Sequence, residues 1–192
     1  MIKLYPNPIL KKVCEPYDLK QNEALLESLL RYMKAVLYAF DGVGLAAPQI
    51  GDDKRIFVVD ITKSGTERQA GTNFMVFVNP EILESTGGVN SEEGCLSFPG
   101  ASAIIKRASL VRVKCDYPIY HGETELEAEG LLARVIQHEM DHLGGKTLID
   151  HVGKTQQYFI RKNVKKNVKN ELMRQKSFAT IISKVLQGEN NG

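Results

Sequence analysis

Hydrophobic residues recur at helical spacing in two parts of the chain and predict an amphipathic helix in each. Over residues 23–40 they follow one another every three or four positions, and Asn22 is placed to cap the first turn. A second helix is expected over about 130–143, because Gly144 and Gly145 provide a suitable C-terminal stop. Both segments should therefore bury one face against the rest of the protein.

Shorter hydrophobic runs and alternating patterns predict strands at 56–59, 74–78, 110–120 and 123–129. Between the last two, His121 and Gly122 indicate a hairpin turn. Irregular structure is expected at 1–20, 41–51 and 62–73, where proline, glycine or polar residues interrupt the pattern. Strands that precede and separate the helices, without regular strand–helix alternation, predict an α+β fold.

The C-terminal part has a different pattern. Between Lys154 and Lys176 there are eight lysines or arginines and one acid, Glu171. A hydrophobic stripe repeats every four residues and predicts a basic amphipathic helix: Ile160, Val164, Val168 and Leu172. We therefore expect a main domain over 1–153, a helical extension of that domain over 154–187, and a disordered tail at 188–192.

Composition and charge exclude several classes of protein. With 192 residues, 43% hydrophobic and 25% charged, the chain can form one domain with a substantial core. The net charge of +2 is too small to indicate DNA binding, and no hydrophobic run is long enough to span a membrane. Three cysteines do not suggest a disulfide framework, and the N-terminus lacks the hydrophobic stretch of a secretory signal. A reducing, cytoplasmic location is expected.

The segment His138-Glu139-Met140-Asp141-His142 is typical of a metal site. Two histidines four apart on a helix lie on one face, and the glutamate between them is placed to move protons to and from a water at the metal. Chance could produce this spacing on a polar helix face. Leu131 and Val135 lie on the same stripe, however, so the histidines should face the interior, where they need a partner.

Cys95 is a candidate third ligand. Two imidazoles and one thiolate leave a fourth position open, which is typical of catalytic rather than structural metal sites. A lone cysteine is more often a small buried hydrophobic residue, and we interpret Cys14 and Cys115 in this way. The glycine-rich segment 42–49 permits close backbone contacts, and it ends in Gln49, whose amide could donate a hydrogen bond to a developing oxyanion.

Three segments together resemble the motifs of the peptide deformylase family, in that family's order. They are G-x-G-x-A-A-x-Q at 42–49, E-G-C-x-S at 93–97 and Q-H-E-x-D-H at 137–142. The resemblance extends over roughly residues 5–152. It implies antiparallel sheets around a central metal-binding helix, with a C-terminal helix in addition. It also implies hydrolysis of the formyl group from the N-formylmethionine of newly made proteins.

The resemblance implies a role for individual residues. Cys95, His138 and His142 would bind the metal, and Glu139 would be the catalytic carboxylate. The Gln49 amide and the backbone N–H of Leu96 would bind the oxyanion. Substrate contacts would come from Val43, Gly44 and Gly94, with Val135 beside Val43 in a methionine pocket. Glu93 would pair with Arg107.

The same resemblance implies Fe(II) as the physiological ion, although a Cys/His/His site also accepts zinc, nickel or cobalt. The expected partners are N-formylmethionyl nascent peptides, and the basic helix could dock on the ribosome or simply be solvated. Two other classes remain open. A metallopeptidase would need a third ligand after the helix, for which Asp150 and His151 are the nearest candidates. A ribosome- or RNA-binding module would need only the basic tail.

Overall fold

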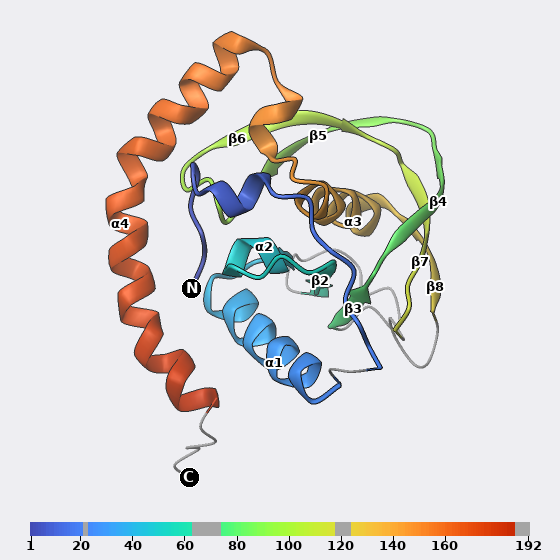
Figure 1. Cartoon of the computed structure of the whole chain (residues 1–192). Coiled ribbons are helices and arrows are strands. Elements are labelled where there is room, and N and C mark those ends of the chain that lie inside the picture. The colour runs from blue at the N-terminus through green and yellow to red at the C-terminus, as the bar shows by residue number, and fades with distance from the viewer. Residues whose placement is uncertain (21–22, 63–73, 118–123, 187–192) are drawn as a thin grey trace.

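The computed structural model describes residues 1–20, 23–62, 74–117 and 124–186. Its strands are all paired antiparallel within three small sheets. One sheet has the order β1-β2-β3, the second β4-β7-β8, and the third β5-β6. Helix α3 (Gly130–Leu143) contacts strands of the first two sheets and lies between them (Figure 1). The fold is therefore α+β, with antiparallel sheets around a central helix, as the sequence predicted.

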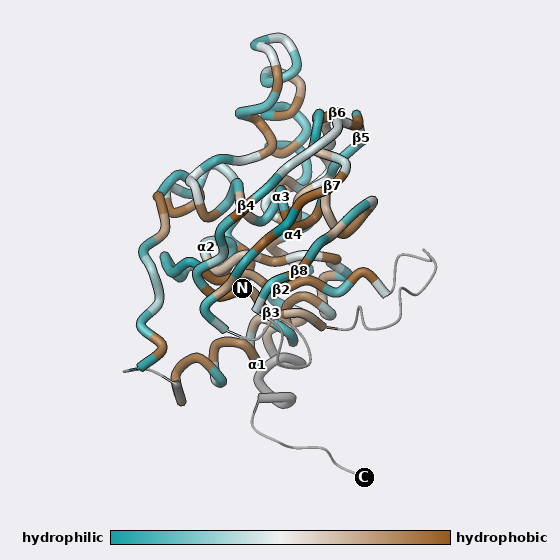
Figure 2. Tube along the Cα trace, turned by 90° about the vertical axis from the view of Figure 1, so that its right-hand side faces the viewer, coloured by the Kyte–Doolittle hydropathy of each residue, from teal (hydrophilic) through white to brown (hydrophobic). Residues whose placement is uncertain are grey.

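The first sheet forms the centre of the core. It consists of β1 (Gly44–Ala46), β2 (Ile56–Val59) and β3 (Met75–Val78). Every residue of β2 is buried and hydrophobic, and the tube there is continuously brown in Figure 2. Phe57 of β2 stacks on Phe77 of β3 with ring centroids 4.4 Å apart. This packing against α3 on one face and α1 (Glu23–Ala39) on the other holds the central helix in place.

The second and third sheets contain three strands that the hydrophobic pattern did not predict: β4 (Glu81–Thr86), β5 (Val89–Gly94) and β6 (Ser102–Arg107). Strands β4 and β5 are mostly exposed and polar, so they lack the hydrophobic alternation that indicates a strand. In contrast, β7 (Leu110–Lys114) and β8 (Glu125–Glu129) lie within the segments where strands were expected. The first is shorter than predicted, because residues 115–117 are not part of a strand. The predicted hairpin turn between them, and the N-terminal cap of α1, lie outside the described residues.

Residues 41–51 were wrongly predicted to be irregular. They contain β1 and the short helix α2 (Ala47–Ile50), which places Gln49 in the core with 1% of its surface exposed. Residues 1–20 also contain one 3-10 turn, Pro8–Lys11. Glycine and proline obscured the ordered elements here. Both residues interrupt the hydrophobic pattern, but a helix or strand can still form around them.

The C-terminal helix α4 (Lys154–Leu186) runs along one side of the molecule and passes α1 (Figure 1). Ile160 and Val164 are buried against Phe98 and its neighbours, as the predicted stripe requires. Leu172 is 48% exposed, however, and Gln175 is buried instead. A helix turns every 3.6 residues, so a stripe of period four drifts away from the contact face. No helix in the described part of the chain is both long enough and apolar enough to cross a membrane.

Candidate metal centre and active site

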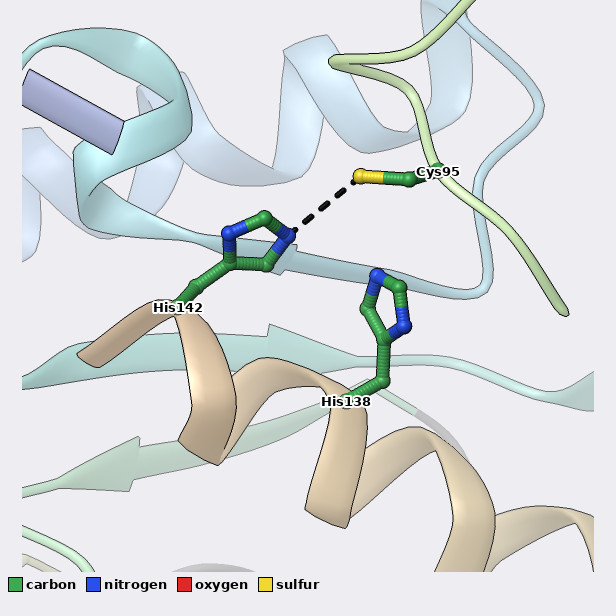
Figure 3. Close-up of side chains that lie close together, drawn as sticks. All are labelled: Cys95, His138 and His142. Carbon is green, nitrogen blue, oxygen red and sulfur yellow. Dashed lines mark hydrogen bonds between the residues drawn. The ribbon is translucent and has the colours of Figure 1, made fainter. Parts of the chain in front are cut away.

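Helix α3 and the segment after β5 bring one thiol and two imidazoles together (Figure 3). One ligand atom from each of Cys95, His138 and His142 lies within 4.8 Å of the others. The Cys95 Sγ is 3.3 Å from the His142 Nε2, and His142 is only 1% exposed. Because the two histidines are one helical turn apart, their rings project side by side from the same face of α3 (Figure 3).

These three residues fit a divalent metal ion. Metal–sulfur and metal–nitrogen bonds of about 2.3 and 2.0 Å at tetrahedral angles require ligand atoms roughly 3.5 Å apart, close to the observed sulfur–nitrogen distance. The Nδ1 atom of His138 is 3.0 Å from the Glu93 Oε2, which leaves Nε2 as the nitrogen for a metal. Burial lowers the pKa of His142 well below its usual value, so its imidazole stays neutral with a lone pair available.

A buried network orients His138 from behind. Arg107 is 6% exposed and donates to both carboxylate oxygens of Glu93, at 2.8 and 2.9 Å, and to Asp141 at 2.6 Å. Burial alone would raise the pKa of Glu93, but hydrogen bonds from Arg107 and His138 outweigh it and lower the pKa to about 2. His151, the candidate ligand of a metallopeptidase, lies 2.7 Å from the Asp141 carboxylate. The network therefore links the metal centre to the residues just before α4.

Glu139 lies beside this centre and is 3% exposed. Burial raises its pKa to about 7, and its Oε2 atom is buried without a hydrogen-bond partner among the described residues. A carboxyl group with a pKa near neutrality can both accept and donate a proton. Gly44 makes room for it, because a Cβ atom at that position would stand 2.4 Å from the Glu139 Oε1. The lack of a side chain at Gly44 thus permits the observed position of the carboxylate.

Gln49 is held with its amide nitrogen toward the same centre. Its Oε1 accepts a hydrogen bond from the Ala46 N–H at 2.8 Å, which fixes the amide orientation. Its Nε2 lies 3.5 Å from the Cys95 Sγ and 3.3 Å from the Ser97 Oγ. The donor end of the amide is therefore directed at the space around the thiol.

A cavity of about 590 Å³ opens beside these groups. Its walls come from residues 41–44, β5 with the segment after it, and the exposed face of α3. All the residues expected to contact substrate line it: Val43, Gly44, Gly94, Leu96 and Val135. Ser91 and Arg134 also line it and were not identified from the sequence. Arg134 precedes His138 by four residues, so the helical spacing alone could have placed it on this face.

The other cysteines lie away from the centre. Cys14 and Cys115 are 4% and 2% exposed and belong to the hydrophobic core. Burial raises the pKa of Cys14 to about 11 and that of Cys115 to about 12. Both are therefore inert packing residues, as expected. His121 lies outside the described residues.

Comparisons with known proteins point to one family. Residues 1–158 match the family model described as polypeptide deformylase. The chain is 42% identical over 164 residues to a peptide deformylase of Thermodesulfovibrio yellowstonii, covering 85% of this chain and 95% of that protein. A crystal structure of a Legionella pneumophila peptide deformylase is similar at a TM-score of 0.78 and 36% identity, covering 90% of this chain and 96% of that one. A crystal structure of an Arabidopsis thaliana peptide deformylase in complex with an inhibitor is similar at a TM-score of 0.73 and 32% sequence identity. The match covers 88% of this chain and 90% of that chain.

Proposed function

The chain belongs to the polypeptide deformylase family, metal-dependent hydrolases that remove the formyl group from newly made peptides, and from this premise we propose how its residues perform the reaction. Cys95, His138 and His142 hold the metal ion. The observation that carries this assignment is the convergence of one sulfur and two nitrogen atoms within 4.8 Å beside a substrate-sized cavity. A bound metal would polarise the formyl carbonyl and acidify a water molecule.

Glu139 moves the proton in this scheme. Its buried carboxylate takes a proton from the attacking water and delivers it to the nitrogen of the leaving amine, which releases formate and a free N-terminus. A pKa of about 7 suits both steps, because the group neither holds nor releases the proton too strongly. The Gln49 amide and the Leu96 backbone N–H donate hydrogen bonds to the formyl oxygen as negative charge develops on it.

Substrate selection comes from the cavity walls. Val43 and Val135 form part of an apolar pocket for the methionine side chain, and the backbone at Gly44 and Gly94 binds the peptide. The narrow space beside Gly44 favours a formyl group over a bulkier acyl group. Glu93 and Arg107 do not contact substrate in this scheme, but hold His138 in its orientation.

The ion and the cellular location are further parts of the proposal. A site of one thiolate and two imidazoles accepts Fe(II), zinc, nickel or cobalt, and we take Fe(II) as the physiological ion because the family resemblance implies it. The free cysteines suit a reducing cytoplasm, where formylated nascent chains are made. A metallopeptidase with a third ligand downstream of α3 is less well supported. The candidate His151 contacts the Asp141 carboxylate, which is part of the network with Arg107.

The decisive experiment compares formate release from a formyl-Met dipeptide with cleavage of an internal peptide bond. We expect formate release only. Cys95→Ala should lose both the bound metal, measured on anaerobically prepared protein, and the activity. Full metal occupancy in this variant would contradict the ligand assignment, and internal cleavage without formate release would contradict the function.

The exposed face of α4 is a candidate ribosome-docking surface. Lys162, Lys165, Lys166 and Lys169 are exposed, whereas Ile160 and Val164 bury the opposite side of the helix against the domain. Cations held outward on a packed helix can contact the phosphates of ribosomal RNA. Docking there would keep the enzyme close to emerging formylated chains. The competing explanation is that these charges only keep the surface solvated.

A further inference from the structure

Arg134 and Ser91 form a second polar pair beside His138 and Glu93, the pair that orients the metal ligand. Arg134 precedes His138 by four residues on α3, so it lies on the same face about 6 Å farther along the helix axis. Ser91 precedes Glu93 by two residues on β5 and therefore points to the same side of the strand. Arg134 and Ser91 thus repeat the His138–Glu93 arrangement about one helical turn away from the metal ligands, in the wall of the cavity.

The Arg134 guanidinium is fixed by neutral partners. Its Nη1 donates to the Ser91 hydroxyl and its Nε donates to the Gly130 carbonyl at 3.3 Å. The Ser91 hydroxyl donates in turn to the Glu92 carbonyl oxygen at 3.4 Å, so it faces Arg134 as an acceptor. A guanidinium carries five N–H donors, and these two bonds leave the others for a ligand.

No carboxylate neutralises this cation within the part of the chain that the structure describes. The carboxylates of Asp41, Glu92, Glu93 and Glu139 also line this cavity. The two that follow Ser91 on β5 each have another partner. Glu92 accepts from the Ser102 hydroxyl at 2.6 Å, and Glu93 is paired with Arg107. The cavity wall formed by Arg134 and Ser91 is therefore polar and cationic, whereas Val43, Leu131 and Val135 supply apolar walls.

We propose that Arg134 is a specificity-determining residue that lets the first side-chain pocket accept a methionine-length side chain with a hydrogen-bond acceptor at its tip. Methionine sulfoxide has this chemistry, because oxidation adds a strong acceptor oxygen to the thioether without lengthening the chain. An apolar pocket would leave that oxygen unpaired at a cost. Arg134 offers it charged donors, so formyl-methionine sulfoxide peptides are hydrolysed to formate and the free amine like their thioether counterparts. This inference rests on the proposed function.

The test measures kcat/KM for three formyl tripeptides that differ only in the first residue: methionine, methionine sulfoxide and norleucine. Wild type, Arg134→Leu and Arg134→Gln are compared as metal-loaded enzymes. Arg134→Leu should raise the methionine-to-sulfoxide ratio of kcat/KM at least about tenfold, because a hydrogen bond from a charged donor is lost. Arg134→Gln keeps neutral donors and should give an intermediate ratio. The norleucine-to-methionine ratio should move little, since neither tip is a strong acceptor.

Arg112→Leu is the matched control, because Arg112 lies on β7 outside the cavity and its side chain is 45% exposed. Its three ratios should equal those of wild type. An unchanged methionine-to-sulfoxide ratio in both Arg134 variants would overturn the proposal while the proposed function stands. Failure of wild type to release formate from the methionine peptide would refute the proposed function itself, and this inference with it.

Discussion

At the scale of single residues, Glu139 combines burial, a pKa of about 7 and a carboxylate oxygen that has no hydrogen-bond partner in the described part of the chain. It is adjacent in sequence to a proposed ligand without being one. Glu139→Gln should therefore retain the metal and lose about 10²–10⁴-fold in kcat, the usual contribution of a positioned acid–base group. Metal analysis and formate release on the same preparation check this. Turnover near that of wild type would exclude the proton-transfer role.

Gly44 determines where that carboxylate can lie. A Cβ atom there would stand 2.4 Å from the Glu139 Oε1 and 2.7 Å from the Val135 Cγ1. Gly44→Ala should thus displace Glu139, and a displacement of about 1 Å can cost 10²-fold in rate. Gly153→Ala is the control, since a Cβ atom there meets nothing within 4 Å. We expect kcat to fall only in the first variant, while thermal unfolding shows that both remain folded.

At the scale of elements, α3 carries the proposed catalytic residues, whereas α4 presents an exposed basic surface. Helix α3 carries the metal-binding face and is packed between sheets, so changes there affect catalysis and folding together. Helix α4 buries Ile160 and Val164 but leaves its lysines exposed. Charges on α4 can therefore be removed without disturbing the metal centre, which makes its proposed docking role separable from activity.

Changing Lys162, Lys165, Lys166 and Lys169 together to Gln should abolish co-sedimentation with ribosomes at low salt. In wild type this binding should weaken steeply as salt rises, because each phosphate contact releases counterions. A matched control changes Lys20, Lys106, Lys114 and Lys146, which are also exposed, and removes the same charge elsewhere. Deformylation of a free dipeptide should be equal in all three proteins. If the α4 variant and the control bind equally well, the docking surface is not on α4.

At the scale of the whole molecule, the Glu93–Arg107–Asp141 network ties β5, β6 and α3 together. The pKa of Glu93 is lowered in the folded state to about 2 from an ordinary 4.5. A lowered carboxyl pKa stabilises the fold above the unfolded value, and this stabilisation is lost as the pH falls from about 4.5 through about 2. The network should thus contribute to resistance against acid unfolding.

Glu93→Gln tests this contribution in metal-free protein, where metal release cannot interfere. At pH 6 the variant should be less stable than wild type by on the order of 2 kcal/mol in the free energy of unfolding. The difference should shrink between pH 4.5 and pH 2, as wild type loses the same interaction. Denaturant unfolding at several pH values measures it. A difference that stays constant over this range would mean that Glu93 does not titrate as described.

The sequence by itself determined the elements whose hydrophobic pattern is local. Residues 23–40 and 130–143 are helices almost to the predicted ends, because each has one continuous apolar face. The types and spacing of His138, Glu139 and His142 identified the metal-binding face for the same reason, since four residues of helix bring two side chains together without help from the fold. The resemblance of three short motifs gave the family, which the comparisons confirm.

Contacts between distant residues depend on the tertiary structure, and the sequence indicated Cys95 with the histidines and Glu93 with Arg107 only through the family resemblance. Cys95 reaches His142 because β5 ends beside α3, and Arg107 bridges Glu93 and Asp141 from a third element. Strands such as β4 are stabilised by pairing with β7 and not by their own pattern, so an exposed polar sequence could not reveal them. The same holds for Arg134 and Ser91. Helical spacing could place Arg134 on the face of His138, but its pairing with Ser91 in one cavity wall exists only when β5 and α3 are packed together.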